Sequence, residues 1–333
     1  MLPWLPPPRL PGFPRLRTVL AGLQLHHPVG IAAGFDKDAR VHAALLRHGF
    51  AFVEVGTVTP RPQTGNPKPR LFRLAADEAI INRLGFNSAG AAAVARRLAT
   101  RDRGRGVVGV NLGINRDAAD PIEEYREGLS TLGPLADYVT LNVSSPNTPG
   151  LRALQQREAL DRILTALAPH RGRIPLFLKI APDLAPEEEA AVAELCLAHR
   201  VDALIVGNTT VARPATLRSP AAREAGGLSG RPLFPRSTRA LARMAVRLEG
   251  RIPLVGAGGV ASGADAYAKI RAGATAVQLY SALVYRGLAV IGRVLEELDG
   301  FLARDRLDRV ADAVGRDAAH LAEARIDGVR RVN

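Results

Sequence analysis

The amino-acid sequence predicts a single-domain α/β protein with a (β/α)8 TIM barrel fold. From Pro28 onward, short apolar runs rich in β-branched residues alternate with helical patterns, which is typical of βαβ units and a parallel sheet. Eight such units over roughly 270 residues match this barrel in number and size. A doubly wound open sheet would instead have a glycine-rich turn after its first strand and a break near the middle of the chain, and the sequence has neither.

Each predicted strand is a short apolar run that ends in a polar or glycine-rich turn. The predicted strands are residues 29–33, 52–57, 107–112, 138–143, 176–180, 203–206, 253–257 and 276–280. The helical patterns that follow them are residues 39–49, 89–99, 121–132, 157–168, 186–199, 235–248, 262–272 and 288–302. A chain of 333 residues, 47% of them hydrophobic, is long enough to bury the core of such a domain.

The barrel is expected to span residues 23–304, between two flanking segments. Residues 1–22 form a proline-rich arm, because six prolines in the first 17 residues prevent a regular helix and favour an extended path over the surface. An inserted loop at residues 58–86 follows the second strand, and insertions of this length are more often lids or ligand walls than passive connectors. Residues 305–333 form a tail with a short helix around residues 308–313.

The formal net charge of +13 would suit contact with nucleic acid or anionic lipid. The basic residues are spread along the chain as Arg without a polybasic block, so either a general preference for Arg or a functional surface for anions accounts for the charge. Lysine occurs only at positions 37, 68, 179 and 269. A compact ammonium group is therefore expected to matter at these positions.

Cys196 is the only cysteine in the sequence, which argues against a disulfide framework and a Cys-based metal cluster and favours a reducing, intracellular setting. No stretch reaches the roughly 18 to 20 apolar residues that span a bilayer. The N-terminus lacks the pattern of a secretory signal peptide. No metal site is predicted.

Active sites of such barrels form where the strands end, and the sequence is unusually polar at these points. The fourth strand runs into a loop of short hydrogen-bonding side chains at residues 144–148, which Pro146 and Pro149 stiffen. Lys179 in the apolar fifth strand faces either the barrel mouth or an expensive burial. Lys37 follows the first strand and suits a carboxylate, although a surface lysine flanked by acids is the alternative.

Glycine loops at residues 226–231 and 256–259, with residues 280–281 after the eighth strand, indicate a phosphorylated cofactor. Exposed N–H groups and helix dipoles at such loops meet an anion. Together with Lys179 and the asparagines at strand ends, these loops favour a flavin mononucleotide (FMN) beside a small heterocyclic carboxylate. A sugar-phosphate isomerase is the competing barrel enzyme, but its chemistry would need an ionisable Glu, His or Asp at a strand end, and none stands out.

Seven motifs follow one another between about Leu23 and Gly287, at residues 32–38, 54–63, 82–87, 142–150, 179–183, 226–232 and 280–281. In this order they resemble the quinone-dependent, class 2 dihydroorotate dehydrogenases. The resemblance implies oxidation of (S)-dihydroorotate to orotate in de novo pyrimidine (UMP) biosynthesis. It also implies that one non-covalent FMN per chain takes up the hydride and that the electrons pass to a quinone.

The resemblance implies roles for individual residues as well. Ser145 matches the catalytic base, and Thr148 and Phe86 match the neighbours that relay its proton and shield it from water. The implied substrate contacts are Lys37, Asn82, Arg83, Leu84, Gly85, Phe86, Asn142, Asn147, Asn208 and Thr209. The implied FMN contacts are Ala33, Gly34, Thr57, Asn111, Asn142, Lys179, Gly207, Gly230, Gly259, Tyr280 and Ser281.

Two departures from the family pattern are visible in the sequence. Gly207 stands where the family usually has Thr, which predicts a lost side-chain contact and weaker FMN binding that restoring Thr would correct. Class 2 enzymes also carry a small helical domain before the barrel that forms the quinone tunnel and rests on the membrane. Only the proline-rich arm precedes the barrel here, so that domain is expected to be missing or truncated by a misassigned start.

The resemblance further implies a monomer on the cytoplasmic side of the cell membrane with peripheral contact, or a cytoplasmic protein if the helical domain is truly absent. Nucleic acid is not an expected partner. The alternatives are a class 1-like dihydroorotate dehydrogenase with a soluble acceptor and a non-catalytic barrel that binds flavin or RNA. Class 1 enzymes use Cys as the base, so Ser145 argues against a class 1-like enzyme. A steep fall of the affinity for RNA with rising salt concentration would support the RNA-binding barrel.

Overall fold

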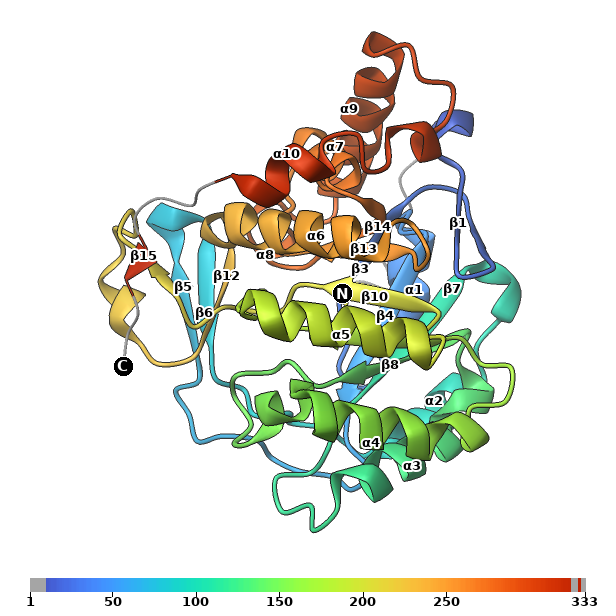
Figure 1. Cartoon of the computed structure of the whole chain (residues 1–333), viewed down its shortest axis with the longest axis vertical. Helices are drawn as coiled ribbons and strands as arrows, with labels where there is room; N and C mark the ends of the chain where they lie inside the picture. The colour runs from blue at the N-terminus through green and yellow to red at the C-terminus, as the bar shows by residue number, and fades with distance from the viewer. Residues whose placement is uncertain (1–9, 325–328, 331–333) are drawn as a thin grey trace.

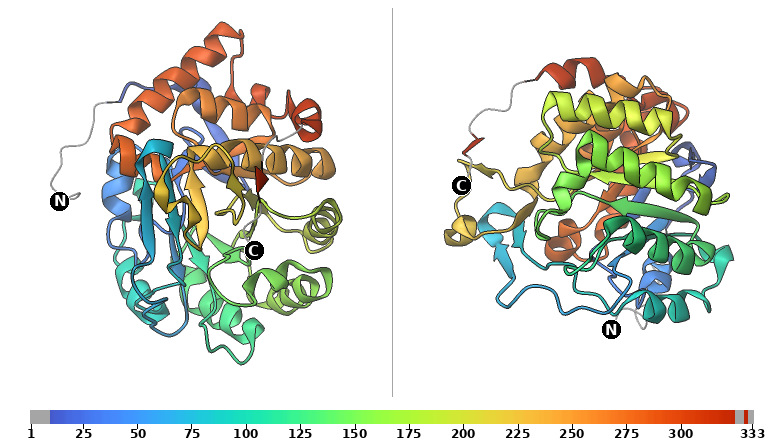
Figure 2. Two further views of the ribbon diagram at one scale, coloured as in Figure 1. Left: turned by 90° about the vertical axis from the view of Figure 1, so that its left-hand side faces the viewer. Right: turned by 60° about the horizontal axis from the view of Figure 1, so that its bottom comes forward.

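The computed structural model describes residues 10–324 and 329–330. Within these residues, eight parallel strands close into a barrel in the order β10-β13-β14-β3-β4-β7-β8-β9, and helices surround it (Figures 1 and 2). The predicted (β/α)8 barrel is therefore confirmed. The barrel strands are β3 (Val29–Ile31), β4 (Phe52–Val58), β7 (Val107–Leu112), β8 (Tyr138–Asn142), β9 (Leu176–Ile180), β10 (Ala203–Val206), β13 (Leu254–Ala257) and β14 (Ala274–Leu279).

The barrel strands are apolar because helices cover their outer faces and side chains fill the barrel. Every residue of β8, β9 and β10 is buried. Inside the N-terminal half of the barrel, Phe52, Tyr138 and Phe177 belong to one apolar cluster, and the rings of Tyr138 and Phe177 stack with centroids 4.2 Å apart. This packed layer fills the N-terminal half of the barrel with side chains, which leaves the C-terminal end of the barrel for a ligand site.

Two of the helices around the barrel, α3 and α7, begin at a capping side chain. Asp120 accepts a hydrogen bond from the Ile122 amide at 2.8 Å at the start of α3, and Ser262 accepts one from the Asp265 amide at 3.1 Å at the start of α7. The helices of the barrel units are α1 (His42–Arg47), α2 (Ala91–Leu98), α3 (Pro121–Leu132), α4 (Arg157–Leu167), α5 (Pro186–Ala198), α6 (Phe234–Leu248), α7 (Gly263–Arg271), α8 (Ser281–Arg286) and α9 (Val290–Arg304).

One predicted helix is shorter than expected, and one helix was not predicted. The helix predicted at residues 39–49 is shorter, because Ala39 has a left-handed backbone with φ of 57° and cannot start it. Helix α8 follows β14 directly and was not predicted, since six residues are too few to show a helical period. Gly287, with φ of 65°, separates α8 from α9.

Residues 1–9 of the predicted arm lie outside the described residues. Pro11, Gly12, Pro14 and Arg15 are exposed, as expected for a path over the surface, but Leu16 is fully buried in the main core. Strands β1 (Thr18–Leu20) and β2 (Leu23–Leu25) form an antiparallel hairpin. Leu20 and Leu25 of this hairpin join the cluster of Phe52 and Tyr138, so the hairpin closes the N-terminal end of the barrel.

The insertion after β4 forms part of a small sheet at the opposite end of the barrel. Strands β5 (Leu71–Leu74) and β6 (Ala79–Asn82) form a hairpin, and β12 (Gly227–Gly230) pairs antiparallel with β6. Figure 1 shows these three strands on the left and β1 on the right. We call β5, β6 and β12 the mouth sheet. Residues 226–231, predicted as a glycine loop, are therefore largely a strand, because β6 supplies a pairing edge that local sequence does not reveal.

The tail contains one predicted and one unpredicted helical segment. The short helix expected around residues 308–313 is a 3-10 helix at Val310–Ala313, and α10 (Ala318–Glu323) packs against α6. Strand β15 (Val329–Arg330) pairs with β11 (Arg213–Pro214), and the rest of the tail beyond residue 324 lies outside the described residues. Among the helices that the structure describes, none is long and apolar enough to cross a membrane.

Candidate functional site

Two adjoining cavities lie at the C-terminal end of the barrel, and their empty space, with the solvent at their open mouths included, is about 700 and 570 Å³. Both are lined by Ala33, Lys179, Asn208, Thr209 and Tyr280. Of the residues predicted from the sequence, the larger cavity is also lined by Gly207, Gly230, Gly259 and Ser281. The smaller cavity is also lined by Gly34, Lys37, Thr57, Asn82, Leu84, Gly85, Phe86, Asn142, Ser145 and Asn147.

Three predicted residues lie behind the walls of these cavities. The Arg83 guanidinium donates to Glu224 at 2.8 Å and lies 4.6 Å from the centre of the Phe72 ring, away from the smaller cavity. Asn111 is fully buried below the site, where it hydrogen-bonds other barrel residues. Thr148 is also buried, and its hydroxyl has no hydrogen-bond partner among the described residues.

A buried carboxylate below the cavities was not recognised from the sequence. Glu54 of β4 is fully buried and accepts hydrogen bonds from Asn111 at 2.7 Å and from Gln278 at 3.0 Å. The hydroxyls of Tyr138 and Thr140 each donate to it at 3.2 Å. The available signal was an acidic residue inside the apolar run of residues 52–58. Four donors from the three strands β7, β8 and β14 satisfy the charge, as a buried carboxylate requires.

Lys179 lies above this carboxylate and faces both cavities. Its Nζ is 4.0 Å from Glu54 Oε1, and its side chain is only 6% exposed. Burial lowers the pKa of Lys179, and the negative charge of Glu54 opposes that effect. Glu54 therefore opposes the loss of a proton from Lys179 in a site from which water is largely excluded.

The loop after β8 carries Ser145 into the smaller cavity. Ser145 is 7% exposed, and its Oγ accepts a hydrogen bond from the Asn147 amide at 3.3 Å. The Asn147 side chain donates to Asn82 Oδ1 of β6 at 3.1 Å. At the strand end, Asn142 donates to Thr57 at 2.9 Å and accepts from Asn208 at 3.4 Å. The loop is thereby fixed against both the barrel and the mouth sheet.

Arg152 holds the Ser145 loop from below and was also missed in the sequence. It donates to the carbonyl of Ser144 at 3.1 Å, to the carbonyl of Thr209 at 2.9 Å and to Asp183 at 3.0 Å. Asp183 also accepts from the Thr210 hydroxyl at 2.5 Å. One guanidinium thus joins the loops after β8, β9 and β10, which no local pattern could have indicated.

Lys37 contributes an unpaired ammonium group to the smaller cavity. It makes no hydrogen bond or ion pair with any residue that the structure describes. Burial lowers the pKa of Lys37 to about 8, although Asp38 acts in the opposite direction. A cation without a counter-ion in a cavity is suited to an anionic ligand.

The insertion supplies one wall of the smaller cavity. Gln63 donates to the Phe86 carbonyl at 2.9 Å, and Asn66 donates to the Asn147 carbonyl at 3.2 Å. Phe86 is held with a left-handed backbone, φ of 51°, and only 6% of it is exposed. These contacts place an aromatic ring over the cavity and connect the insertion to the Ser145 loop.

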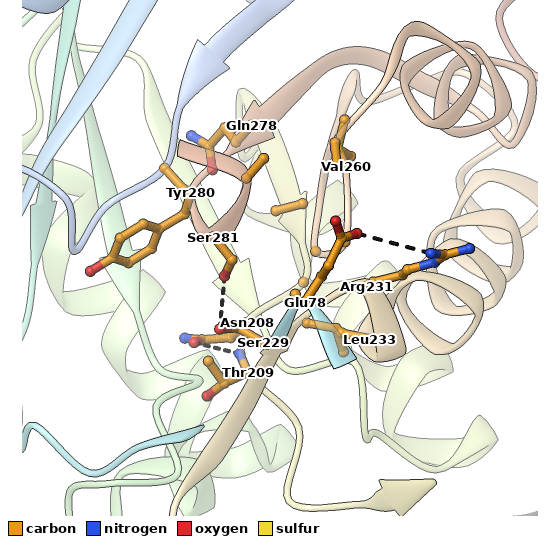
Figure 3. A pocket seen from close by; sticks show the side chains of 18 of the residues that line it. Glu78, Asn208, Thr209, Ser229, Arg231, Leu233, Val260, Gln278, Tyr280 and Ser281 are labelled. Atoms are coloured by element: carbon orange, nitrogen blue, oxygen red, sulfur yellow. Dashed lines mark hydrogen bonds and ion pairs between the residues drawn. The ribbon is translucent and has the colours of Figure 1, made fainter. Parts of the chain in front are cut away.

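The larger cavity offers free amides to an anionic group and polar side chains to a planar ring. Gly259 and Val260 make no hydrogen bond with described residues, so their amides can bind an anion. A Cβ at Gly259 would lie 2.5 Å from Phe234. The side-chain oxygens of Gln278 and Thr209 are buried without partners, as expected for groups that face the amides of a ring. Figure 3 shows Ser281 facing Ser229, with a hydroxyl contact of 2.9 Å.

The surroundings of Gly207 argue against the sequence-based expectation that Thr would restore a contact there. Its backbone has φ of 128°, and a Cβ at this position would lie 2.3 Å from the Ala257 carbonyl oxygen. A side chain therefore cannot be added without moving the neighbouring strand end. Restoring Thr here should not simply regain a contact.

Comparisons with known proteins agree with this geometry. The family model for dihydroorotate dehydrogenase matches residues 15–302. A Cereibacter sphaeroides protein named dihydroorotate dehydrogenase (quinone) is 55% identical over 91% of this chain and 86% of its own. A Bradyrhizobium diazoefficiens protein of the same name is 52% identical over 92% and 87%. A crystal structure of DHODH from Eimeria tenella in complex with ferulenol superimposes with a TM-score of 0.91 at 45% identity, covering 94% of this chain and 91% of that chain.

Proposed function

This chain belongs to the dihydroorotate dehydrogenase family, and on that premise we propose that it oxidises dihydroorotate to orotate, binds FMN and passes the electrons to a quinone. The observation that carries the proposal is the convergence of Ser145 and Lys37 in one cavity that adjoins the larger cavity along Lys179. Family membership alone would not specify a base. The smaller cavity offers Ser145 as the base and places it in the same cavity as the cationic Lys37.

Substrate binding follows from the charges and amides of the smaller cavity. Dihydroorotate is a carboxylate, and the unpaired ammonium of Lys37 would neutralise it. The amides of Asn82 and Asn147 offer donors and acceptors to the ring of the substrate. The hydrogen bond between these two asparagines joins the mouth sheet to the Ser145 loop, so substrate contacts on both sides keep their spacing.

Ser145 would remove the proton from C5 of the substrate as a hydride leaves C6, which creates the C5–C6 double bond. FMN, when bound, would accept that hydride at its N5 atom. Serine is a weak base, so it needs a dry site and a stabilising donor. The Asn147 amide points at Ser145 Oγ, and Phe86 covers the cavity. The unpartnered hydroxyl of Thr148 is suited to take the proton onward.

Lys179 would stabilise the negative charge that the flavin ring gains when it is reduced. It lines both cavities, and its pairing with Glu54 favours the charged form of a buried lysine. A quinone would take up the two electrons that the substrate has given up. Because long-chain quinones reside in lipid, the proposal includes peripheral contact with a membrane, and we propose that the protein acts there as a monomer.

Anaerobic mixing with dihydroorotate tests the proposed function directly. The purified protein should contain FMN, and its flavin absorbance should bleach on addition of dihydroorotate and recover on addition of a quinone. Fumarate and NAD serve as competing acceptors. A protein that holds no flavin, or whose flavin is not reduced by dihydroorotate, would refute the proposal, and faster oxidation by fumarate or NAD would refute the quinone assignment.

A further inference from the structure

Lys269 is the buried lysine that the proposed reaction does not use. It lies in α7 and is fully buried, although charged side chains are almost never buried without an ionic partner. Its Nζ donates to Ser237 Oγ of α6 at 2.7 Å and lies 5.2 Å from the centre of the Phe234 ring. It has no ion pair among the described residues, and Asp265 influences it only at longer range.

This burial is costly for the protein without a bound ligand. Removing an ammonium group from water costs several kcal/mol or forces the group to lose its proton. Burial accordingly lowers the pKa of Lys269 well below its usual range, against the opposing charge of Asp265. A methionine would fill the same space without this cost, so packing alone does not explain a lysine here.

Lys269 lies directly beneath the glycine loop of the larger cavity. A Cβ at Gly256 would lie 3.2 Å from Lys269 Cδ, so the strand leading into the loop runs over the lysine side chain. Ser237 accepts from Lys269, and its single hydroxyl hydrogen can be donated to the Gly258 carbonyl at 3.0 Å or to the Phe234 carbonyl at 3.2 Å. The shorter contact joins Ser237 to the glycine loop, where the amides of Gly259 and Val260 have no partner among the described residues.

We propose that Lys269 is a positioning residue for the phosphate of the cofactor: through Ser237 it fixes the glycine loop with its amides free, and it places a positive charge beneath the bound anion. This inference rests on the proposed FMN function. A phosphate dianion at the loop would favour the charged ammonium, so the energy lost by burying the lysine is recovered when the cofactor binds.

The test compares FMN with riboflavin, which has the same ring system but no phosphate. Dissociation constants of both flavins are measured by flavin fluorescence on the flavin-free protein, for wild type and for Lys269→Met. Lys269→Met should weaken FMN binding about tenfold to a hundredfold, as expected for loss of a charge-assisted contact. It should change riboflavin binding less than about twofold and leave the flavin-free protein at least as stable in thermal unfolding.

Two further variants separate charge from folding. Lys68→Met removes the same charge from an exposed lysine and should leave both constants unchanged. Ser237→Ala cuts the link to Gly258 and should weaken FMN in preference to riboflavin, which keeps the test valid if Lys269→Met does not fold. Equal losses for FMN and riboflavin, or no loss for either, would overturn the inference. A wild-type protein that binds neither flavin would instead refute the proposed function.

Discussion

Lys179 Nζ lies 4.0 Å from the Glu54 carboxylate, although the two residues come from strands β9 and β4 on different sides of the barrel. The contact arises because both side chains point into the barrel, whose interior brings distant strands together. It sets the charge balance of the site: one buried carboxylate, four hydrogen-bond donors and one lysine that faces the ligands.

Glu54→Gln should destabilise the flavin-free protein by about 3 to 5 kcal/mol, because it leaves Lys179 as an uncompensated buried charge. The double variant Glu54→Gln/Lys179→Met should lose less than the sum of the two single variants, since it removes both charges together. Denaturant unfolding of all four proteins measures the coupling. Additive losses would show that the two charges do not interact.

Ser145→Ala should slow reduction of the flavin by dihydroorotate by about 10² to 10⁴, the usual effect of removing a positioned base. Orotate should still bind within a few-fold of wild type, because Ser145 is one of many contacts in the cavity. Stopped-flow reduction and an orotate titration give the two values. Ser145→Cys should keep some activity that rises with pH, since a thiol ionises more easily. An unchanged reduction rate in Ser145→Ala would remove Ser145 from the mechanism.

Orotate affinity should fall as pH rises through about 8, the pKa to which burial lowers Lys37. The charged form of Lys37 binds the carboxylate, and it predominates at pH 7 but is a small fraction at pH 9. The expected loss between these values is about tenfold. Lys37→Met should bind weakly at every pH, whereas the exposed control Lys68→Met should follow wild type. Orotate binding that is independent of pH in the wild type would contradict the assignment.

Arg152→Met should slow flavin reduction about tenfold to a hundredfold without releasing FMN, because the Ser144 and Thr209 carbonyls lose their common donor. A shift of the Ser145 loop by about 1 Å is enough for such a loss. Asp183→Asn should give a smaller effect in the same direction. Arg157→Met, at an exposed arginine paired with Glu194, is the matched control. If it slows the reaction as much as Arg152→Met does, the Arg152 contacts are not specific to the site.

Gly207→Thr should lower thermal stability and speed the release of FMN, opposite to the effect expected from the family pattern. The φ of 128° and the Ala257 carbonyl 2.3 Å from a Cβ require the strand end to move, at a cost of about 1 to 3 kcal/mol. FMN release after dilution and thermal unfolding measure both effects. Slower release than wild type would favour the sequence-based expectation instead.

Several site residues could be predicted because their signal is local. Lys179 interrupts an apolar strand, and Ser145 follows one within a proline-stiffened loop; both line the smaller cavity. Arg152 and Glu54 could not be predicted in the same way, because an arginine in a loop and one acid in a strand are common. Their importance lies in partners 31 and 57 residues away.

The sequence by itself determined the barrel, its eight strands and the polar strand ends, because the alternation of apolar strands with amphipathic helices is a local property of the chain. Only the tertiary structure decided which segments cover the two ends of the barrel. The β1–β2 hairpin fills its N-terminal end, and β12 leaves the expected loop to pair with β6. Those outcomes depend on which segments become neighbours after the barrel forms, as do the charge of Glu54 beneath Lys179 and the lack of space at Gly207. Neighbours across a closed barrel are set by strand order and register, which no window of sequence contains.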